Sequence, residues 1–223
     1  MTERVLITGA TGGLGKELAS ALINLGYVVF GVGRSLDDLE ELQTMGVETL
    51  KIDLSSELAA KKIISKFPTV EILINNAGVF PIKKLAESSL NDYNETFNVN
   101  VRAPFELMKH YIPKMKANGK GKVINVLSSS AFSGSPDTAL YCASKHALLG
   151  LTRSAFLENK GTGVDVYSIS PGSMKTKMGA TDTRQDYDTF IEPREISRFI
   201  CFTLNSCDSS VYDEVRINRS IIR

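Results

Sequence analysis

Seven short apolar segments, rich in Val and Ile, are separated by longer stretches in which apolar residues recur at helical spacing. The short segments are Arg4–Thr8, Tyr27–Val32, Glu48–Ile52, Glu71–Asn75, Lys122–Leu127, Val164–Ile169 and Val211–Ile217. Most of them are continuously hydrophobic, which is typical of strands buried on both faces of a parallel sheet. We therefore predict that each is a β-strand.

The stretches between the strands carry helix signals. Apolar residues share one helix face at Leu14, Leu18, Ala21, Leu22 and Leu25, and Gly26 is typical of a residue that ends a helix. Further helices are predicted at Asp37–Met45, Ser55–Phe67, Ser88–Ala117 and Leu140–Asn159. Strands that alternate with helices predict an α/β fold, a parallel sheet with helices on both faces. No linker or internal repeat divides the chain, so residues 1–223 are expected to form one domain.

Composition narrows the class of partner. The chain has 26 Lys and Arg against 25 Asp and Glu, a net charge of +1, which argues against nucleic acid or an anionic membrane as the main partner. No signal peptide precedes the first strand, and no apolar run approaches the roughly 20 residues of a membrane span. Three cysteines, Cys142, Cys201 and Cys207, match no metal motif. We expect a cytoplasmic protein with reduced thiols, and pairing of Cys201 with Cys207 is the less favoured alternative.

A glycine-rich turn, TGATGGLGKEL, follows the first predicted strand. Ligands of parallel α/β sheets bind beyond the carboxyl ends of the strands, and this turn lies there. A helix that begins near Gly13 would present unpaired N–H groups and a partial positive charge to phosphate. Glycines would let the backbone approach a dinucleotide closely. The alternative is a tight strand-to-helix turn that binds nothing.

Further motifs follow in order: Asn75–Gly78 (NNAG), Asn100, Ser128, Tyr141–Lys145 (YCASK) and Pro171–Thr176 (PGSMKT). With the glycine turn, this set resembles the short-chain dehydrogenase/reductase family, whose fingerprint is T-G-x-x-x-G-x-G, N-N-A-G, Asn, Ser, Y-x-x-x-K and P-G-x-x-x-T. The resemblance runs from about Val5 to Met178. It implies a single-domain Rossmann-type, doubly wound parallel sheet of about seven strands that transfers hydride between a nicotinamide cofactor and a carbonyl or secondary alcohol.

The resemblance assigns four catalytic residues. Tyr141 is expected to be the general acid or base, and Lys145, one helical turn away, is expected to lower the pKa of Tyr141. Ser128 would hold the substrate oxygen. From local chemistry alone Ser129 and Ser130 are rivals, and the family spacing selects Ser128. Asn100 resembles the asparagine that supports a water relay to the lysine. The alternative is that Asn100 is a buried structural residue hydrogen-bonded to backbone.

The same resemblance places a set of residues on the cofactor: Gly9, Thr11, Gly12, Gly13, Leu14, Gly15, Arg34, Asp53, Leu54, Asn76, Ala77, Gly78, Tyr141, Lys145, Pro171, Gly172, Met174 and Thr176. Gly33 stands where NAD-dependent relatives tend to carry Asp, and Arg34 follows it. Because a guanidinium matches phosphate geometry, we predict NADP(H) rather than NAD(H). The alternative is that Arg34 only lies along the surface.

The substrate side is less defined by sequence. Phe80, Phe132, Ser133 and Met174 are candidates on loops at the same sheet edge, although such residues are often core. The stretch 179–192 is short and polar where many relatives carry a longer apolar lid, which predicts a more open site or a lid completed by a neighbouring subunit. We assign no role to His110, His146 or Cys142, and we expect no metal site.

We interpret the chain as an NADP(H)-dependent oxidoreductase, acting in the direction of carbonyl reduction. An inactive NAD(P)-binding regulator of the same fold is the main alternative, although the four catalytic residues together favour an enzyme. A sugar-nucleotide epimerase or dehydratase would be longer. The resemblance further implies a homodimer or homotetramer through the helices at Ser88–Ala117 and Leu140–Asn159. The basic tail VRINRSIIR lacks the family's usual Gly-Gly ending, so its packing in a tetramer is open.

Overall fold

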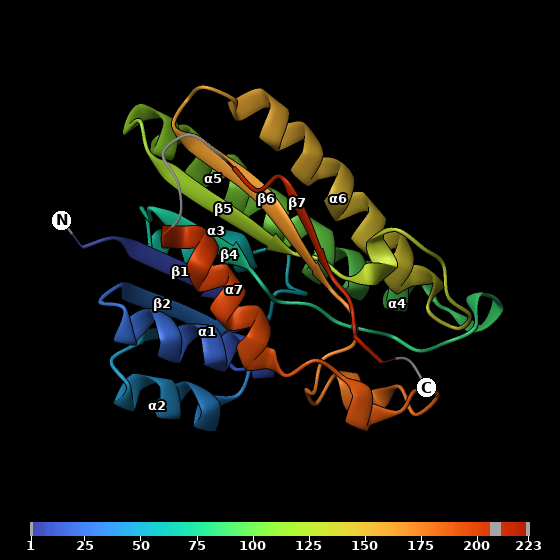
Figure 1. The fold of residues 1–223 in the computed structure, drawn as a ribbon. Helices are drawn as coiled ribbons and strands as arrows, with labels where there is room; N and C mark the ends of the chain where they lie inside the picture. Colours follow the sequence, from blue (N-terminus) through green and yellow to red (C-terminus); the bar gives the residue numbers. More distant parts are fainter. Residues whose placement is uncertain (1, 206–210, 222–223) are drawn as a thin grey trace.

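The computed structural model describes residues 2–205 and 211–221, which form a parallel sheet between two layers of helices (Figure 1). Neighbouring strands follow the order β3-β2-β1-β4-β5-β6-β7, and every pairing is parallel. The strands are β1 (Arg4–Thr8), β2 (Val28–Gly33), β3 (Glu48–Lys51), β4 (Ile72–Asn75), β5 (Gly121–Val126), β6 (Val164–Pro171) and β7 (Glu214–Ile217). The predicted doubly wound sheet of about seven strands is confirmed.

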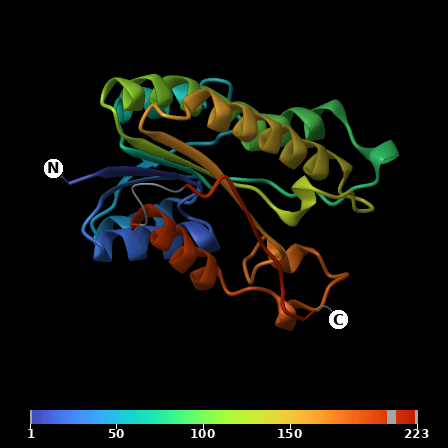
Figure 2. The same ribbon diagram turned by 45° about the horizontal axis from the view of Figure 1, so that its top comes forward.

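Helices cover both faces of the sheet (Figure 2). On one face lie α1 (Gly13–Asn24), α2 (Leu36–Thr44) and α7 (Pro193–Asn205), and on the other lie α3 (Ala59–Lys66), α5 (Ala103–Ala117) and α6 (Ala139–Asn159). Successive β1 side chains alternate between the layers, with Val5 and Ile7 in the first core and Leu6 in the second. Within the described residues, no helix has the length and apolar character needed to cross a membrane.

Most predicted element bounds agree with the structure to within two residues, and two differ by more. The strand predicted from Val211 begins at Glu214, which is the first residue that pairs with β6. The helix predicted from Ser55 begins at Ala59. Ser55 instead donates its backbone N–H to the Asp53 carboxylate at 2.9 Å, which forms a turn before the helix.

The single helix predicted at Ser88–Ala117 is wrong. The chain forms α4 (Leu90–Phe97), a π-helical turn at Asn98–Arg102 and then α5. A capping box between Ser89 and Asp92 begins α4. The apolar pattern continues through the π turn and therefore hides it, although such turns are frequent at functional sites.

β1 and β4 are neighbours at the centre of the sheet, where the strand order reverses. From β1 the chain adds strands toward β3, and from β4 it adds strands toward β7. The chain therefore continues from β1 to α1 on one face of the sheet and from β4 toward α5 on the other. Open α/β sheets bind ligands at the carboxyl ends of the strands at such a point. The glycine-rich turn and the NNAG motif both lie at this point.

Candidate active site

The glycine-rich turn lies against the NNAG motif. Gly9 has a φ of +65°, and a Cβ built on it would lie 2.8 Å from the Ala77 Cα, so no larger residue fits there without a shift. The Thr8 hydroxyl accepts the backbone N–H groups of Asn76 and Ala77, each at 3.1 Å. The Asn76 side chain donates back to the Thr8 carbonyl at 3.0 Å. The two motifs thus form one rigid floor at the switch point.

A cavity of about 520 Å³ lies over this floor, within the usual range for small-molecule sites. Predicted cofactor residues that line it are Gly9, Thr11, Gly12, Gly13, Leu14, Arg34, Asp53, Leu54, Asn76, Ala77, Gly78, Tyr141, Lys145, Met174 and Thr176. Gly15, Pro171 and Gly172 are not among the lining residues. Gly15 packs against the backbone of Gly9 and Ala10, and the Gly172 N–H is bonded to the Ile217 carbonyl at 2.8 Å. Gly15 and Gly172 are thus held by backbone contacts, and Pro171 ends β6 in register with Ile217.

The cavity suits a dinucleotide. The N-terminus of α1 has no side-chain cap at Gly12 and no acidic residue in its first turn, so its backbone N–H groups and partial positive charge are available to a phosphate. A Cβ at Gly13 would lie 2.8 Å from the Thr176 methyl group, which shows how closely the PGSMKT segment approaches the turn. The lining also continues from Arg34 to Tyr141, so one cavity joins the two ends that a nicotinamide dinucleotide must span.

Tyr141 and Lys145 come from successive turns of α6 and are 9% and 3% exposed. The Lys145 ammonium donates to the Val126 carbonyl at 3.0 Å and lies 5.7 Å from the centroid of the Tyr141 ring. Phe80, predicted on the substrate side, packs edge-on against Tyr141 with ring centroids 4.6 Å apart. The predicted pair therefore faces the cavity together.

The expected lowering of the Tyr141 pKa is wrong in this geometry. Burial raises the pKa of Tyr141 to about 12, and a side-chain hydrogen bond with Ser128 offsets only part of that rise. Burial also lowers the pKa of Lys145 to about 8. The lysine is bonded to a backbone carbonyl rather than to the phenol, so its charge does not outweigh the desolvation of Tyr141.

Ser128 follows β5 and is the residue whose side chain is hydrogen-bonded to Tyr141. Its hydroxyl also accepts the Ser130 N–H at 3.1 Å. The two rival serines instead lie in a 3-10 turn at Ser129–Ala131. Ser128 is thus the serine that interacts with Tyr141, although it is not among the residues that line the cavity.

Asn100 is fully buried in the π turn and does not line the cavity. Its amide donates to the Val79 carbonyl at 3.0 Å and to the Ser144 hydroxyl at 2.9 Å, and its oxygen accepts the Val79 N–H at 2.9 Å. A Cβ placed on Gly78 would lie 3.5 Å from the Asn100 oxygen and 3.7 Å from the Lys145 ammonium. Asn100 thus lies directly behind the lysine and fixes the loop that covers it.

Charged residues gather at the other end of the cavity, after β2. Arg34 lines it, and the nearby guanidinium contributes to a lowered pKa of Asp53, after the Ser55 hydrogen bond. A Cβ on Gly33 would lie 2.6 Å from the Thr11 side chain, so an aspartate has little room there.

Sequence reasoning missed three charged residues at this end, Lys16, Asp38 and Lys177, and Lys177 contributes to a lowered pKa of Asp38. Lys16 and Asp38 both line the cavity and form an ion pair at 2.7 Å, and Lys16 also pairs with Glu41. The signal was available for Lys16, because it lies in the first turn of the helix that follows the glycines.

Of the four residues predicted on the substrate side, two lie at the candidate site and two do not. Met174 lines the cavity and Phe80 contacts Tyr141, whereas Phe132 and Ser133 are not among the lining residues. Phe132 instead packs against Arg216, whose Cζ lies 4.1 Å from the centroid of the Phe132 ring. Met178 and Tyr187, which sequence reasoning did not select, line the cavity from the stretch between β6 and α7.

The residues given no role have local partners. His146 Nδ1 is 2.8 Å from the Cys142 carbonyl, and His110 Nε2 is 3.2 Å from the Pro68 carbonyl. Cys142 and Cys201 are free thiols, and the question of a Cys201–Cys207 bond lies outside the described residues. Across residues 2–205 and 211–221, no group of three or more His, Cys, Asp or Glu side chains could hold a metal ion.

Comparisons with known proteins agree with this geometry. The family model described as short chain dehydrogenase matches residues 3–187. An uncharacterized oxidoreductase of Thermotoga maritima is 35% identical over 78% of this chain and 72% of its own. The 3-oxoacyl-[acyl-carrier-protein] reductase FabG of Rickettsia felis is 34% identical over 78% and 73%. A solved structure described as 4-hydroxyisoleucine dehydrogenase complexed with NADH has a TM-score of 0.88 at 25% identity, covering 98% of both chains.

Proposed function

The chain belongs to the short chain dehydrogenase family, and from this premise we propose that it is an NADP(H)-dependent oxidoreductase that interconverts a carbonyl and a secondary alcohol. The observation that carries the proposal is the position of Tyr141 and Lys145 in the same cavity as the glycine-rich turn and Arg34. A bound nicotinamide supplies or accepts the hydride. The side chains of this chain supply binding, orientation and proton transfer.

Tyr141 is the proton donor in this mechanism. With a pKa of about 12, its phenol is protonated at neutral pH, so it can deliver a proton to a substrate oxygen that gains negative charge. We propose that the Ser128 hydroxyl, whose interaction with Tyr141 lowers the pKa of that phenol, donates to the same oxygen. The reverse reaction would require a phenolate that burial disfavours. We propose carbonyl reduction as the direction, in which the neutral phenol is the form that donates the proton.

Lys145 and Asn100 support the proton donor. The buried ammonium favours the phenolate that remains once Tyr141 has given up its proton. Asn100 does not reach the cavity, so we assign it a positioning role through Val79 and Ser144 rather than contact with substrate.

The cofactor assignment rests on Arg34 and Gly33. An arginine beside the cavity can pair with a 2′-phosphate, and glycine ends β2. The acidic residues that line this end, Asp38 and Asp53, are engaged by Lys16 and by the Ser55 N–H. The NADH complex of 4-hydroxyisoleucine dehydrogenase makes NAD(H) the competing candidate. The remaining cofactor contacts are proposed at the predicted residues that line the cavity, with Gly12 to Gly13 at the phosphates and Tyr141 with Lys145 at the nicotinamide end.

Three coarser properties complete the proposal. The described elements share one sheet, so we infer that residues 1–223 form a single domain. Near-neutral charge and the free thiols of Cys142 and Cys201 favour a cytoplasmic protein with a small-molecule substrate. A homodimer or homotetramer is inferred from the family.

Thermal shift with NADP(H) and NAD(H) side by side tests the cofactor assignment, followed by NADPH oxidation at 340 nm with the ketones ethyl acetoacetate and cyclohexanone. Ligand at 100 times its dissociation constant adds about 2.7 kcal/mol to the free energy of unfolding, which raises the melting temperature. A shift with NADPH and consumption of NADPH with at least one carbonyl are expected. Binding of neither dinucleotide would contradict the proposed function.

A further inference from the structure

The stretch between β6 and α7, residues 174–191, forms a closed loop at the mouth of the cavity, here called the lid segment. Its ends meet in a parallel bridge between Met174 and Ile191, and the Ile191 N–H donates to the Ser173 carbonyl at 2.9 Å. Met178 and Tyr187 of this segment line the cavity that contains Tyr141. In Figure 2 the segment, drawn in orange, lies beyond the ends of the strands. The short polar sequence therefore builds a compact cover.

A buried carboxylate organises the segment from inside. The Asp182 side chain is 7% exposed and accepts Nε and Nη2 of Arg184 at 2.7 and 3.1 Å. It also accepts the side-chain amide of Gln185 at 2.7 Å. These donors lower the pKa of Asp182 to about 2, so the carboxylate stays ionised at neutral pH. The bidentate pair fixes the plane of the guanidinium and directs its remaining nitrogen outward.

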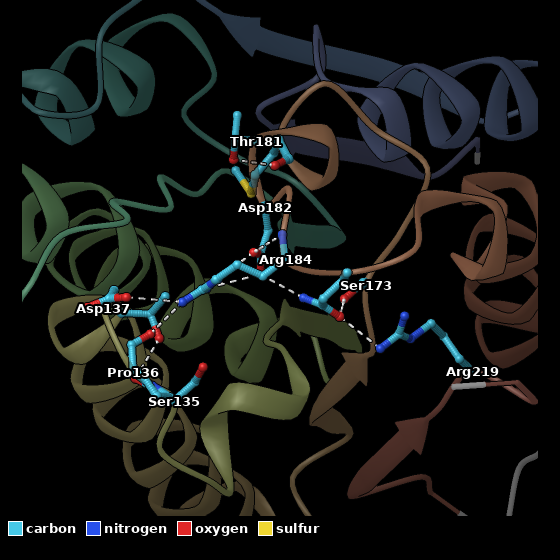
Figure 3. A network of polar contacts seen from close by, with 11 residues as sticks. Ser135, Pro136, Asp137, Ser173, Thr181, Asp182, Arg184 and Arg219 are labelled. Atoms are coloured by element: carbon cyan, nitrogen blue, oxygen red, sulfur yellow. Dashed lines mark hydrogen bonds and ion pairs between the residues drawn. The ribbon is translucent and has the colours of Figure 1, made fainter. Parts of the chain in front are cut away.

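That remaining nitrogen reaches a different part of the chain. Arg184 Nη1 donates to the Pro136 carbonyl at 2.9 Å and lies 3.5 Å from the Asp137 carboxylate (Figure 3). Pro136 and Asp137 belong to the loop 133–138, which leads directly into α6 and Tyr141. Among the described residues, Arg184 makes both of the polar contacts that join the lid segment to this loop.

Asp137 is also a point of strain. Its φ of +59° is positive, the sole such value among non-glycine residues of the described ranges, and this costs about 1 kcal/mol. Its carbonyl accepts the Lys83 N–H at 2.6 Å, from the loop that carries Phe80 against Tyr141. Three segments that border the candidate site thus meet at Asp137. Strained residues persist where surrounding contacts hold them, and they cluster at functional sites.

We propose that Arg184 is a positioning residue that anchors the lid segment to the loop before α6, and so holds Met178 and Tyr187 against the cavity. The proposal rests on the proposed function for the identity of the substrate as a carbonyl. Arg184 itself is paired with Asp182 and Asp137, so its charge is not offered to substrate. It acts through the segment that it holds.

A second anchor keeps the base of the segment in place without Arg184. The Gln185 side-chain oxygen accepts Ser173 Oγ at 3.0 Å and Arg219 Nη2 at 2.8 Å, and Arg219 Nη1 donates to Thr189 at 3.0 Å. Figure 3 shows Ser173 and Arg219 on the side of Arg184 opposite Asp137. Loss of Arg184 should therefore release the outer side of the lid while the fold and the cofactor floor remain intact.

Hydrogen exchange of Arg184→Ala, compared with wild type and with Arg198→Ala, tests the anchor directly. Arg198 is an exposed arginine of α7 and serves as the matched control. We expect the amides of residues 179–190, 137 and 138 to exchange about tenfold faster in Arg184→Ala alone, because charge-assisted hydrogen bonds are lost, with β1 and α1 unchanged. Unchanged exchange in the lid would overturn the proposal, whether or not the protein reduces a carbonyl. Arg184→Gln is the substitute if Arg184→Ala does not fold, with the same expected change in exchange.

Kinetics with NADPH and ethyl acetoacetate separate positioning from catalysis. Arg184→Ala should raise the KM for ethyl acetoacetate about tenfold and leave kcat within about threefold, because it weakens substrate and transition-state binding alike. The dissociation constant of NADPH should not change. A large loss of kcat with KM unchanged would contradict the positioning role. Failure of the wild type to bind NADPH would instead contradict the proposed function and leave the exchange result as the test of the anchor.

Discussion

At the scale of single residues, the phenol of Tyr141 is the group on which the proposed reaction depends. Tyr141→Phe removes one oxygen from a buried ring and keeps its packing against Phe80. Loss of a positioned proton donor is expected to lower kcat about 10²- to 10⁴-fold, with NADPH binding kept. Turnover at 340 nm and an NADPH titration measure the two quantities. Tyr27→Phe, whose hydroxyl contacts Asn205 outside the cavity, is the control, and near-normal turnover in Tyr141→Phe would refute the assignment.

The depressed pKa of Lys145 gives the reaction a pH dependence of known sign. Burial lowers this pKa from 10.5 to about 8, so the ammonium is present below pH 8 and is lost as the pH rises through that value. Tyr141, with a pKa of about 12, stays protonated across the same range. Carbonyl reduction should therefore be level at neutral pH and fall above about pH 8. The profile of kcat measures this, and Lys145→Met should be slower and lack the fall.

Arg34 is the residue that should distinguish the two cofactors. Its guanidinium lies at the end of the cavity where Gly33 leaves no carboxylate. Arg34→Ala should weaken NADPH binding about 10- to 100-fold, the value of charge-assisted hydrogen bonds, and leave NADH binding unchanged. Fluorescence titration with each dinucleotide measures both constants. Equal affinity for the two dinucleotides in the wild type, unaltered in Arg34→Ala, would be incompatible with the NADP(H) assignment.

At the scale of elements, the turn between β1 and α1 is fixed by backbone contact and not only by flexibility. In Gly9→Ala the new Cβ would lie 2.8 Å from the Ala77 Cα at a φ of +65°, so the free energy of unfolding should fall by about 2 kcal/mol or more. In Gly78→Ala the nearest atoms are 3.5 Å away or more, and stability should change by less than about 0.5 kcal/mol. Urea unfolding of both variants tests this difference, and equal stabilities would contradict the packing.

The strands and helices that contribute to the buried layers could be predicted from the sequence, because the spacing of apolar residues indicates which face of an element is buried. The strands and α1 follow from that pattern. The π turn at Asn98–Arg102 could not, because the apolar pattern runs through it while the cause, the bonds of Asn100 to Val79 and Ser144, joins residues far apart in sequence. The raised pKa of Tyr141 has a similar origin, since burial outweighs a lysine four residues away.

For the whole molecule, the ordered motifs predicted which loops meet at the sheet edge, because strand order in a parallel sheet determines that meeting. Thr8, Asn76 and Tyr141 are brought together accordingly. The lid segment escaped prediction because its contacts are polar and tertiary. Arg184 lies eight residues beyond Thr176, where the last family motif ends, and nothing in the local sequence indicates that it reaches Pro136.

The exposed apolar residues of the surface help to predict the oligomeric state of the protein. The family suggests association through α4, α5 and α6, and on these helices Leu90, Phe105 and Leu157 are 81%, 45% and 64% exposed. In a homodimer or homotetramer that associates through these helices, such exposed apolar side chains would be covered. Size-exclusion chromatography with light scattering should give a dimer or tetramer at micromolar concentration. Phe105→Glu should shift that species toward monomer, because it places a charge in the covered face. Leu25→Glu, which changes an apolar residue 53% exposed at the end of α1, should leave assembly unaltered, and a monomeric wild type would refute the interface.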